Sequence, residues 1–257
     1  MNPKTFYLVL VTMTVLAVVV FVALQYYKAG YGFLRTKNWG PSIPNRIGWF
    51  IMEVPVFILL LFLLVKSERP ITICLIVITC IFEMHYFQRS FVFPFLIRGK
   101  STMPISIIVM GMVFNSVNAY MQGGWLYFFS PDRMYVNSWL YSPQFIIGTI
   151  IFIFGFYINI QSDYIIRHLR KEGDDTHKHY IPYGGMFKYV SSANYFGEIT
   201  EWVGFAILSW SPSGLVFAVW TCANLVPRSN SLYEKYAEEF GEEFTKLNRK
   251  RVIPFIY

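Results

Sequence analysis

The feature that most constrains this chain is a series of long apolar stretches separated by short polar segments. A helix needs about 20 residues to cross a bilayer, and seven stretches approach or exceed that length: residues 5–27, 46–66, 71–97, 104–128, 142–167, 193–210 and 212–228. Of the 257 residues, 55% are hydrophobic and only 14% are charged, against about 25% charged in an ordinary soluble domain. The sequence therefore predicts an all-α membrane protein, with seven transmembrane helices in one bundle and a single membrane domain over residues 1–257.

The distribution of positive charge predicts the orientation. Seven crossings place the termini on opposite sides, and the connecting segments then carry 17 Lys and Arg residues on one side and 4 on the other, with Arg89 inside a span. Segments rich in Lys and Arg face the cytoplasm. We therefore expect the C-terminus in the cytoplasm, with the protein in the inner membrane of a bacterium or the endoplasmic reticulum of a eukaryote.

The C-terminal tail, residues 229–257, has its own pattern. Aromatic and aliphatic side chains recur at helical spacing among five glutamates: Tyr233, Tyr236, Phe240, Phe244 and Leu247. An apolar stripe on a charged helix is typical of helices that lie at an interface. The pattern predicts a cytoplasmic amphipathic helix under the bundle.

Several kinds of chemistry are missing from the sequence. His168, His177 and His179 lie in a polar segment without metal-ligand spacing, and there is no GxSxG, GxxxxGK[ST] or GxGxxG motif. The net charge of +7 gathers at the ends of apolar stretches, which favours a membrane surface or an anionic ligand over nucleic acid. We expect neither a metal site nor a nucleic-acid site.

Acidic residues inside the spans point to a polar cavity. Charged groups at bilayer depth are costly and usually face the bundle interior or a wet cavity. Five acids lie within predicted spans: Glu53, Glu83, Asp163, Glu198 and Glu201.

Two of these spans carry polar stripes. One face of the fifth span has polar side chains at i, i+4, i+8 and i+11, and the sixth has a matching i, i+4, i+7 face: Asn159, Asp163, Arg167 and Arg170, then Asn194, Glu198 and Glu201. Such groups can hold helices together, with the acids paired to arginines. Two facing stripes that open on the arginine-rich side favour the alternative, a bound anionic, hydrogen-bonding ligand.

Two other polar groups stand alone in apolar aromatic surroundings. Glu53 follows Trp49 and Phe50, and Tyr86 lies in the segment 85–89. A carboxyl group in an apolar pocket can remain protonated and donate a hydrogen bond, as a tyrosine hydroxyl does. Together they could polarise a carbonyl group, although an ordinary buried tyrosine is the simpler interpretation of Tyr86 alone.

These segments resemble a known family. The motifs, in this order, are Trp49-Phe50-x-x-Glu53-x-Pro55, His85-Tyr86-Phe87-x-Arg89, the segment from Asn159 to Arg170, Ile181-Pro182-x-Gly184-Gly185-x-Phe187, Ala193-Asn194-x-x-Gly197-Glu198-x-x-Glu201-Trp202 and Ile253-Pro254-Phe255-Ile256. They are similar to the steroid 5-alpha-reductases (3-oxo-5-alpha-steroid 4-dehydrogenases). The resemblance implies a seven-helix membrane bundle that binds NADPH from the cytoplasm and reduces the 4,5 double bond of a 3-oxo-steroid.

The resemblance also implies roles for individual residues. It makes Glu53 and Tyr86 the catalytic pair. Trp49, Phe50 and Trp202 provide apolar walls that suit a flat sterol. The implied cofactor contacts are Lys100, Asn159, Asp163, Arg170, Asn194, Glu198, Arg228 and Tyr233.

The expected reaction is hydride transfer to C5 of a steroid or sterol-like lipid, with the enolate stabilised by Tyr86 and Glu53. One alternative is a related membrane reductase of another lipid enone or of a polyprenol. A proton-coupled transporter that uses the intramembrane carboxylates is the second, although the sequence shows no inverted repeat.

Overall fold

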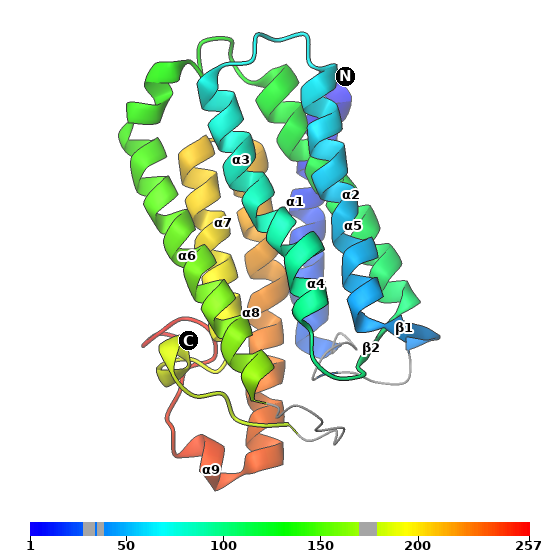
Figure 1. Cartoon of the computed structure of the whole chain (residues 1–257), viewed down its shortest axis with the longest axis vertical. Coiled ribbons are helices and arrows are strands. Elements are labelled where there is room, and N and C mark those ends of the chain that lie inside the picture. Colours follow the sequence, from blue (N-terminus) through cyan, green and yellow to red (C-terminus); the bar gives the residue numbers. More distant parts are fainter. Residues whose placement is uncertain (28–33, 35–38, 170–178) are drawn as a thin grey trace.

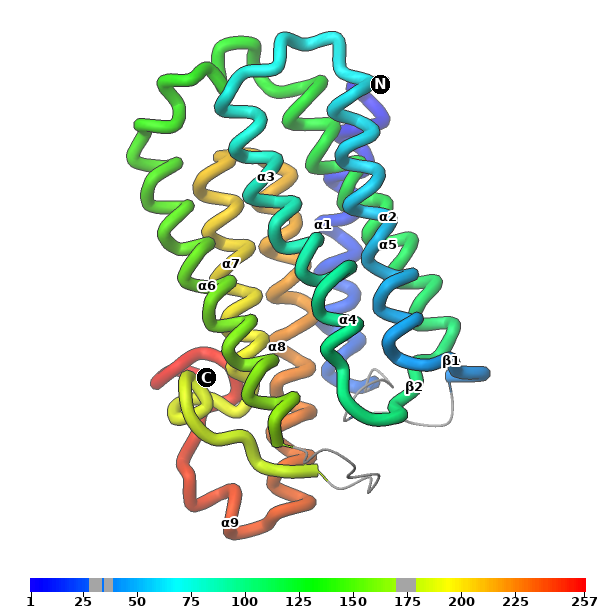
Figure 2. Tube along the Cα trace, viewed as in Figure 1, coloured from blue at the N-terminus to red at the C-terminus, as the bar shows by residue number. Residues whose placement is uncertain are grey.

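The computed structural model describes residues 1–27, 34, 39–169 and 179–257. Its long helices lie side by side in a bundle, with the two termini at opposite ends (Figures 1 and 2). The helices are α1 (Pro3–Tyr26), α2 (Asn45–Lys66), α3 (Ile73–Phe87), α5 (Ile105–Gly124), α6 (Pro143–His168), α7 (Ala193–Ser209) and α8 (Pro212–Phe240). Within the described residues the prediction of an all-α bundle is confirmed, apart from one small two-stranded antiparallel sheet of β1 (Ser42–Pro44) and β2 (Thr102–Pro104). We call the end of the bundle that carries these strands the sheet end.

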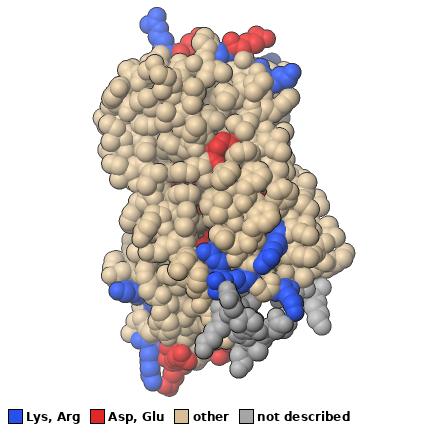
Figure 3. All heavy atoms as spheres, viewed as in Figure 1, with Lys and Arg blue, Asp and Glu red and all other residues tan. Residues whose placement is uncertain are grey.

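Among the residues described, four helices are long and apolar enough to cross a membrane by length and composition: α1, α2, α6 and the continuous segment Ile105–Phe129. Large apolar side chains such as Val11, Val15 and Val18 on α1 are exposed, as expected where lipid is the outer solvent. In Figure 3 the charged side chains gather at the two ends, with a mostly uncharged band between them. The seven-span count also requires α7, the first part of α8 and the helix that begins with α3, and it stays a prediction.

The third predicted span is interrupted by a wider helical turn. After α3 the chain forms the π-helical turn η3 (Gln88–Val92) and then α4 (Phe93–Leu96). Phe93 N donates to Gln88 O, five residues back. Pro94 has no N–H for the Ser90 carbonyl, and a π turn accommodates such a gap. A second π turn, η4 (Trp125–Phe129), likewise comes shortly before a proline, Pro131. The η3 turn carries the buried Arg89 into the bundle.

Glycines bring α6 and α7 into backbone contact. A Cβ atom at Gly155 would lie 2.3 Å from Glu201 N, and one at Gly148 would lie 2.3 Å from Leu208 N. On α7, a Cβ atom at Gly197 would lie 2.5 Å from Asn159 N, and one at Gly204 would lie 2.3 Å from Phe152 N. Small residues permit this approach in membrane bundles. The seam fixes the two predicted polar stripes opposite each other.

The tail differs from its prediction. The predicted separate amphipathic helix is the continuation of α8, which runs through Pro227 to Phe240. Gly241, at a φ of 53°, ends it, and the short α9 (Glu242–Thr245) follows. This turn brings Phe244 back against Tyr236, with stacked rings 5.3 Å apart. The apolar side chains keep helical spacing across Gly241, so the pattern alone did not indicate the turn that this glycine makes possible.

The last residues of the chain fold back on the segment that precedes α7. Ser191 N donates to Lys250 O at 2.8 Å, and Arg249 Nη1 donates to Pro182 O at 2.8 Å. This segment includes the 3₁₀ turn η6 (Gly185–Lys188); a second, η5 (Asn137–Tyr141), precedes α6. The contacts fix the start of α7, where one polar stripe begins.

Candidate active site

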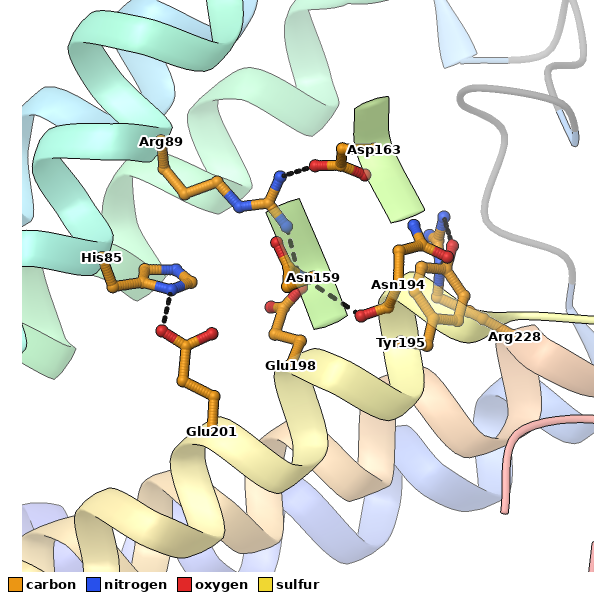
Figure 4. A network of polar contacts seen from close by, with 9 residues as sticks. All are labelled: His85, Arg89, Asn159, Asp163, Asn194, Tyr195, Glu198, Glu201 and Arg228. Atoms are coloured by element: carbon orange, nitrogen blue, oxygen red, sulfur yellow. Dashed lines mark hydrogen bonds and ion pairs between the residues drawn. The ribbon is translucent and has the colours of Figure 1, made fainter. Parts of the chain in front are cut away.

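Arg89 is the centre of a buried ion network between three segments. From η3, its Nη1 donates to Asp163 Oδ2 on α6 at 2.9 Å and its Nη2 donates to Glu198 Oε2 on α7 at 3.1 Å (Figure 4). Arg89 is 6% exposed. Removal of Arg89 would take the cation from both carboxylates, whereas removal of one acid would leave Arg89 paired with the other.

The two predicted stripes do face each other. Asn159 Nδ2 on α6 donates to Asn194 O on α7 at 3.0 Å. Deeper in the bundle, His85 Nδ1 lies 2.7 Å from Glu201 Oε1 (Figure 4). The acids thus have partners of the kind that the helix-contact interpretation predicts, and the same contacts gather amide, carboxylate and guanidinium groups in one place.

Amides of α5 bind both members of the predicted catalytic pair. Asn118 Nδ2 donates to the Tyr86 hydroxyl at 2.9 Å, and Asn115 Nδ2 donates to Glu53 Oε2 at 3.0 Å. Since the two asparagines are three residues apart, they lie on one face of α5. Tyr86 and Glu53 are therefore brought to neighbouring turns of the same helix.

Trp202 forms one wall beside Tyr86. It is 1% exposed, and its ring centroid lies 5.8 Å from that of Tyr86, 4.6 Å from that of His85 and 4.5 Å from that of Phe217. The Tyr86 hydroxyl therefore lies in a dry aromatic setting, where a hydrogen bond is stronger than it is in water.

The other predicted apolar walls lie towards the sheet end. Trp49 packs edge-on against Phe93, at 5.2 Å, and its ring lies 5.7 Å from the Arg89 guanidinium carbon. Phe50 is 37% exposed and packs against Phe91. The structure thus brings Trp49 to the ion network, Trp202 to Tyr86 and Phe50 to the bundle surface.

The remaining predicted cofactor residues that the structure describes lie around the sheet end. Arg228 is buried, and its Nη2 donates to the Tyr195 hydroxyl at 3.2 Å, beside Asn194. Tyr233 packs against Phe244 and under the Arg251 guanidinium, whose carbon is 5.0 Å from the ring. Lys100 is exposed in the segment before β2, and Arg170 lies outside the described residues.

Some buried polar atoms of the site have no hydrogen-bond partner within the described residues. They include Glu201 Oε2 and Trp202 Nε1, an acceptor and a donor. Buried polar groups are normally hydrogen-bonded. Their location beside the Tyr86 wall marks a place where a ligand could supply the missing partners.

The sequence reasoning missed Asn115, Asn118 and Gln122. Gln122 Nε2 donates to Asn118 Oδ1 at 3.1 Å and so extends the chain of amides that begins at Tyr86. Their i, i+3, i+7 spacing within an apolar stretch is the signal that could have identified them.

Known proteins are similar to this chain over almost its whole length. A family model described as 3-oxo-5-alpha-steroid 4-dehydrogenase matches residues 101–257. Steroid 5-alpha-reductase DET2 of Gossypium hirsutum is 36% identical over 256 residues, covering 98% of this chain and 97% of that protein. The 3-oxo-5-alpha-steroid 4-dehydrogenase 1 of Mus musculus is 40% identical over 243 residues, covering 94% and 92%. The resemblance noted in the motifs is therefore confirmed, and the chain belongs to the steroid 5-alpha-reductase family of oxidoreductases.

Proposed function

We propose that this chain reduces the 4,5 double bond of 3-oxo-Δ4 steroids with NADPH as the reductant. The observation that carries the proposal is the hydrogen bond from Asn118 to the Tyr86 hydroxyl in a dry aromatic wall. The names of the relatives, which describe steroid reductases, supply the substrate class.

The donor set fits NADPH. A carboxamide and ribose hydroxyls need amides and carboxylates, while phosphates need cations. Arg89 uses one oxygen each of Asp163 and Glu198, so the second oxygen of each carboxylate can accept from a hydroxyl. The residues that would hold the cofactor are Asn159, Asp163, Asn194, Glu198, Arg228, Tyr233, Lys100 and, outside the described residues, Arg170.

Tyr86 and Glu53 then act on the substrate carbonyl. The Tyr86 oxygen accepts from Asn118, which leaves the hydroxyl hydrogen free to donate to the 3-oxo oxygen. A neutral Glu53, whose Oε2 accepts from Asn115, donates from its other oxygen. NADPH, when bound, supplies a hydride for C5. The two donors stabilise the negative charge that develops on the oxygen, as an oxyanion hole does, and a proton taken up at C4 from water completes the reduction.

The same proposal includes an orientation. The Lys and Arg count of 17 against 4 favours a multi-pass protein with the sheet end and the C-terminus in the cytoplasm. NADPH would then reach Arg228 and the two stripes from the cytoplasm, while a steroid would enter from the bilayer.

The experiment is turnover by the purified protein in detergent. We expect a 3-oxo-Δ4 steroid incubated with NADPH to give a product heavier by two hydrogens in mass spectrometry. A reaction without NADPH and one with a steroid that lacks the double bond are the controls. Turnover of only another lipid enone or a polyprenol would refute the steroid assignment. Substrate flux into proteoliposomes without reductant would favour a transporter instead.

A further inference from the structure

Glu83 is an intramembrane acid that the proposed function does not use. It lies on α3, is 7% exposed, and neither of its carboxyl oxygens has a hydrogen-bond partner within the described residues. A buried polar group without a partner costs stability, and in a membrane helix it usually serves function. The carboxyl group therefore needs an explanation outside the internal contacts of the bundle.

Thr79, one turn before Glu83 on α3, already has its partners, one of them on η4. Thr79 Oγ1 donates to Leu75 O at 2.7 Å and lies 2.7 Å from the Tyr127 hydroxyl. Thr79, Glu83 and Tyr86 follow i, i+4, i+7, so they share one face of α3. Glu83 thus lies beside a closed polar pair and keeps its own hydrogen-bonding capacity for another group.

The order of residues along α3 and η3 indicates which group that is. Arg89 belongs to the ion network at the sheet end, and Tyr86 follows deeper in the bundle. Glu83 lies about 4.5 Å beyond Tyr86 along the helix axis. In the proposed function the cofactor lies on the Arg89 side and the substrate carbonyl at Tyr86. The part of the substrate that points away from the cofactor therefore extends towards Glu83.

We propose that Glu83 determines substrate specificity by hydrogen-bonding a second oxygen of the lipid substrate, a hydroxyl or keto group remote from the enone. A neutral carboxyl group offers one donor and one acceptor, so it binds either group. The inference rests on the proposed function for the position of the enone.

Three substrates with the same enone test the proposal. They are 3-oxo-Δ4 steroids that carry a hydroxyl group, a keto group or only hydrogen on the D ring. We expect Glu83→Leu to reduce the preference in kcat/KM for the hydroxyl steroid over the deoxy steroid by about tenfold, the effect of one good hydrogen bond. Glu83→Gln, which keeps a donor and an acceptor, should retain most of the preference. Glu68→Gln, at an exposed acid, is the matched control. Equal losses for all three steroids would overturn the proposal.

A second readout does not depend on turnover. Because Glu83→Leu removes a carboxyl group that has no partner in the described part of the chain, we expect its thermal midpoint in detergent without steroid to equal or exceed that of the parent. The rise in midpoint caused by the hydroxyl steroid should be smaller than in the parent, while the rise caused by the deoxy steroid stays the same. A leucine variant that fails to fold would reveal a structural partner for the carboxyl group and overturn the inference. A parent protein that binds these steroids but reduces none refutes the proposed function alone.

Discussion

The two halves of the polar interior are satisfied in different ways. Towards the sheet end, Arg89 is bound by the carboxylates of Asp163 and Glu198. Deeper in the bundle, both oxygens of Glu83 and one oxygen of Glu201 lack partners within the described residues. A closed ion network supports the fold even without ligand, whereas unpartnered atoms lower stability until something binds them. The comparison separates groups that the fold depends on from groups that a ligand completes.

The largest expected effect on stability comes from removing the arginine at the centre of the ion network. Arg89→Leu leaves the buried carboxylate of Asp163 and the partly exposed one of Glu198 without their arginine, and we expect a loss of about 3 kcal/mol in the free energy of unfolding. Thermal unfolding in detergent measures it. Lys246→Leu breaks the exposed pair with Glu242 and should cost about 0.5 kcal/mol or less. Similar losses in the two variants would show that burial of the network is unimportant.

A smaller loss should follow when the seam that aligns the stripes is forced apart. The new Cβ of Gly155→Ala would lie 2.3 Å from the Glu201 backbone nitrogen, so we expect roughly 1–3 kcal/mol of destabilisation from overpacking. Gly111→Ala is the matched control, because its Cβ would meet only the flexible Met52 side chain. If the two alanine variants have the same thermal midpoint, the α6–α7 contact is looser than described.

The smallest of these effects concerns the amide that binds Tyr86. Asn118→Leu removes a hydrogen bond to the hydroxyl and should reduce single-turnover steroid reduction by about tenfold, with NADPH affinity unchanged. Ser116→Ala, which removes a hydroxyl that donates to Met112 O on its own helix, should keep the parent rate. A parent-like rate in Asn118→Leu would mean that Tyr86 needs no orientation from α5.

The sequence predicts the helix bounds well because span length and apolar composition are local properties. The predicted span 142–167 is the helix Pro143–His168, and 46–66 is Asn45–Lys66. The stripes of α6 and α7 were also predictable, since helical spacing places Asn159 and Asp163 on one face.

Contacts between distant segments were not predictable in the same way. Arg89 was identified as an intramembrane charge, but its partners depend on the π turn before Pro94 and on the glycine seam. The return of the tail onto Ser191 depends on a turn at Gly241, which the apolar periodicity does not predict. Both features arise from tertiary packing, which propensity and periodicity do not contain.

The central claim is that one end of the polar interior binds the cofactor and the deeper part binds the reacting oxygen. The most direct test measures NADPH binding and single-turnover steroid reduction on the same preparations of Asp163→Asn and Tyr86→Phe. We predict that Asp163→Asn weakens NADPH binding, whereas Tyr86→Phe binds NADPH like the parent and loses on the order of 10² to 10³ in reduction rate. A Tyr86→Phe protein that reduces the steroid at the parent rate, or an Asp163→Asn protein with parent NADPH affinity, would contradict the account.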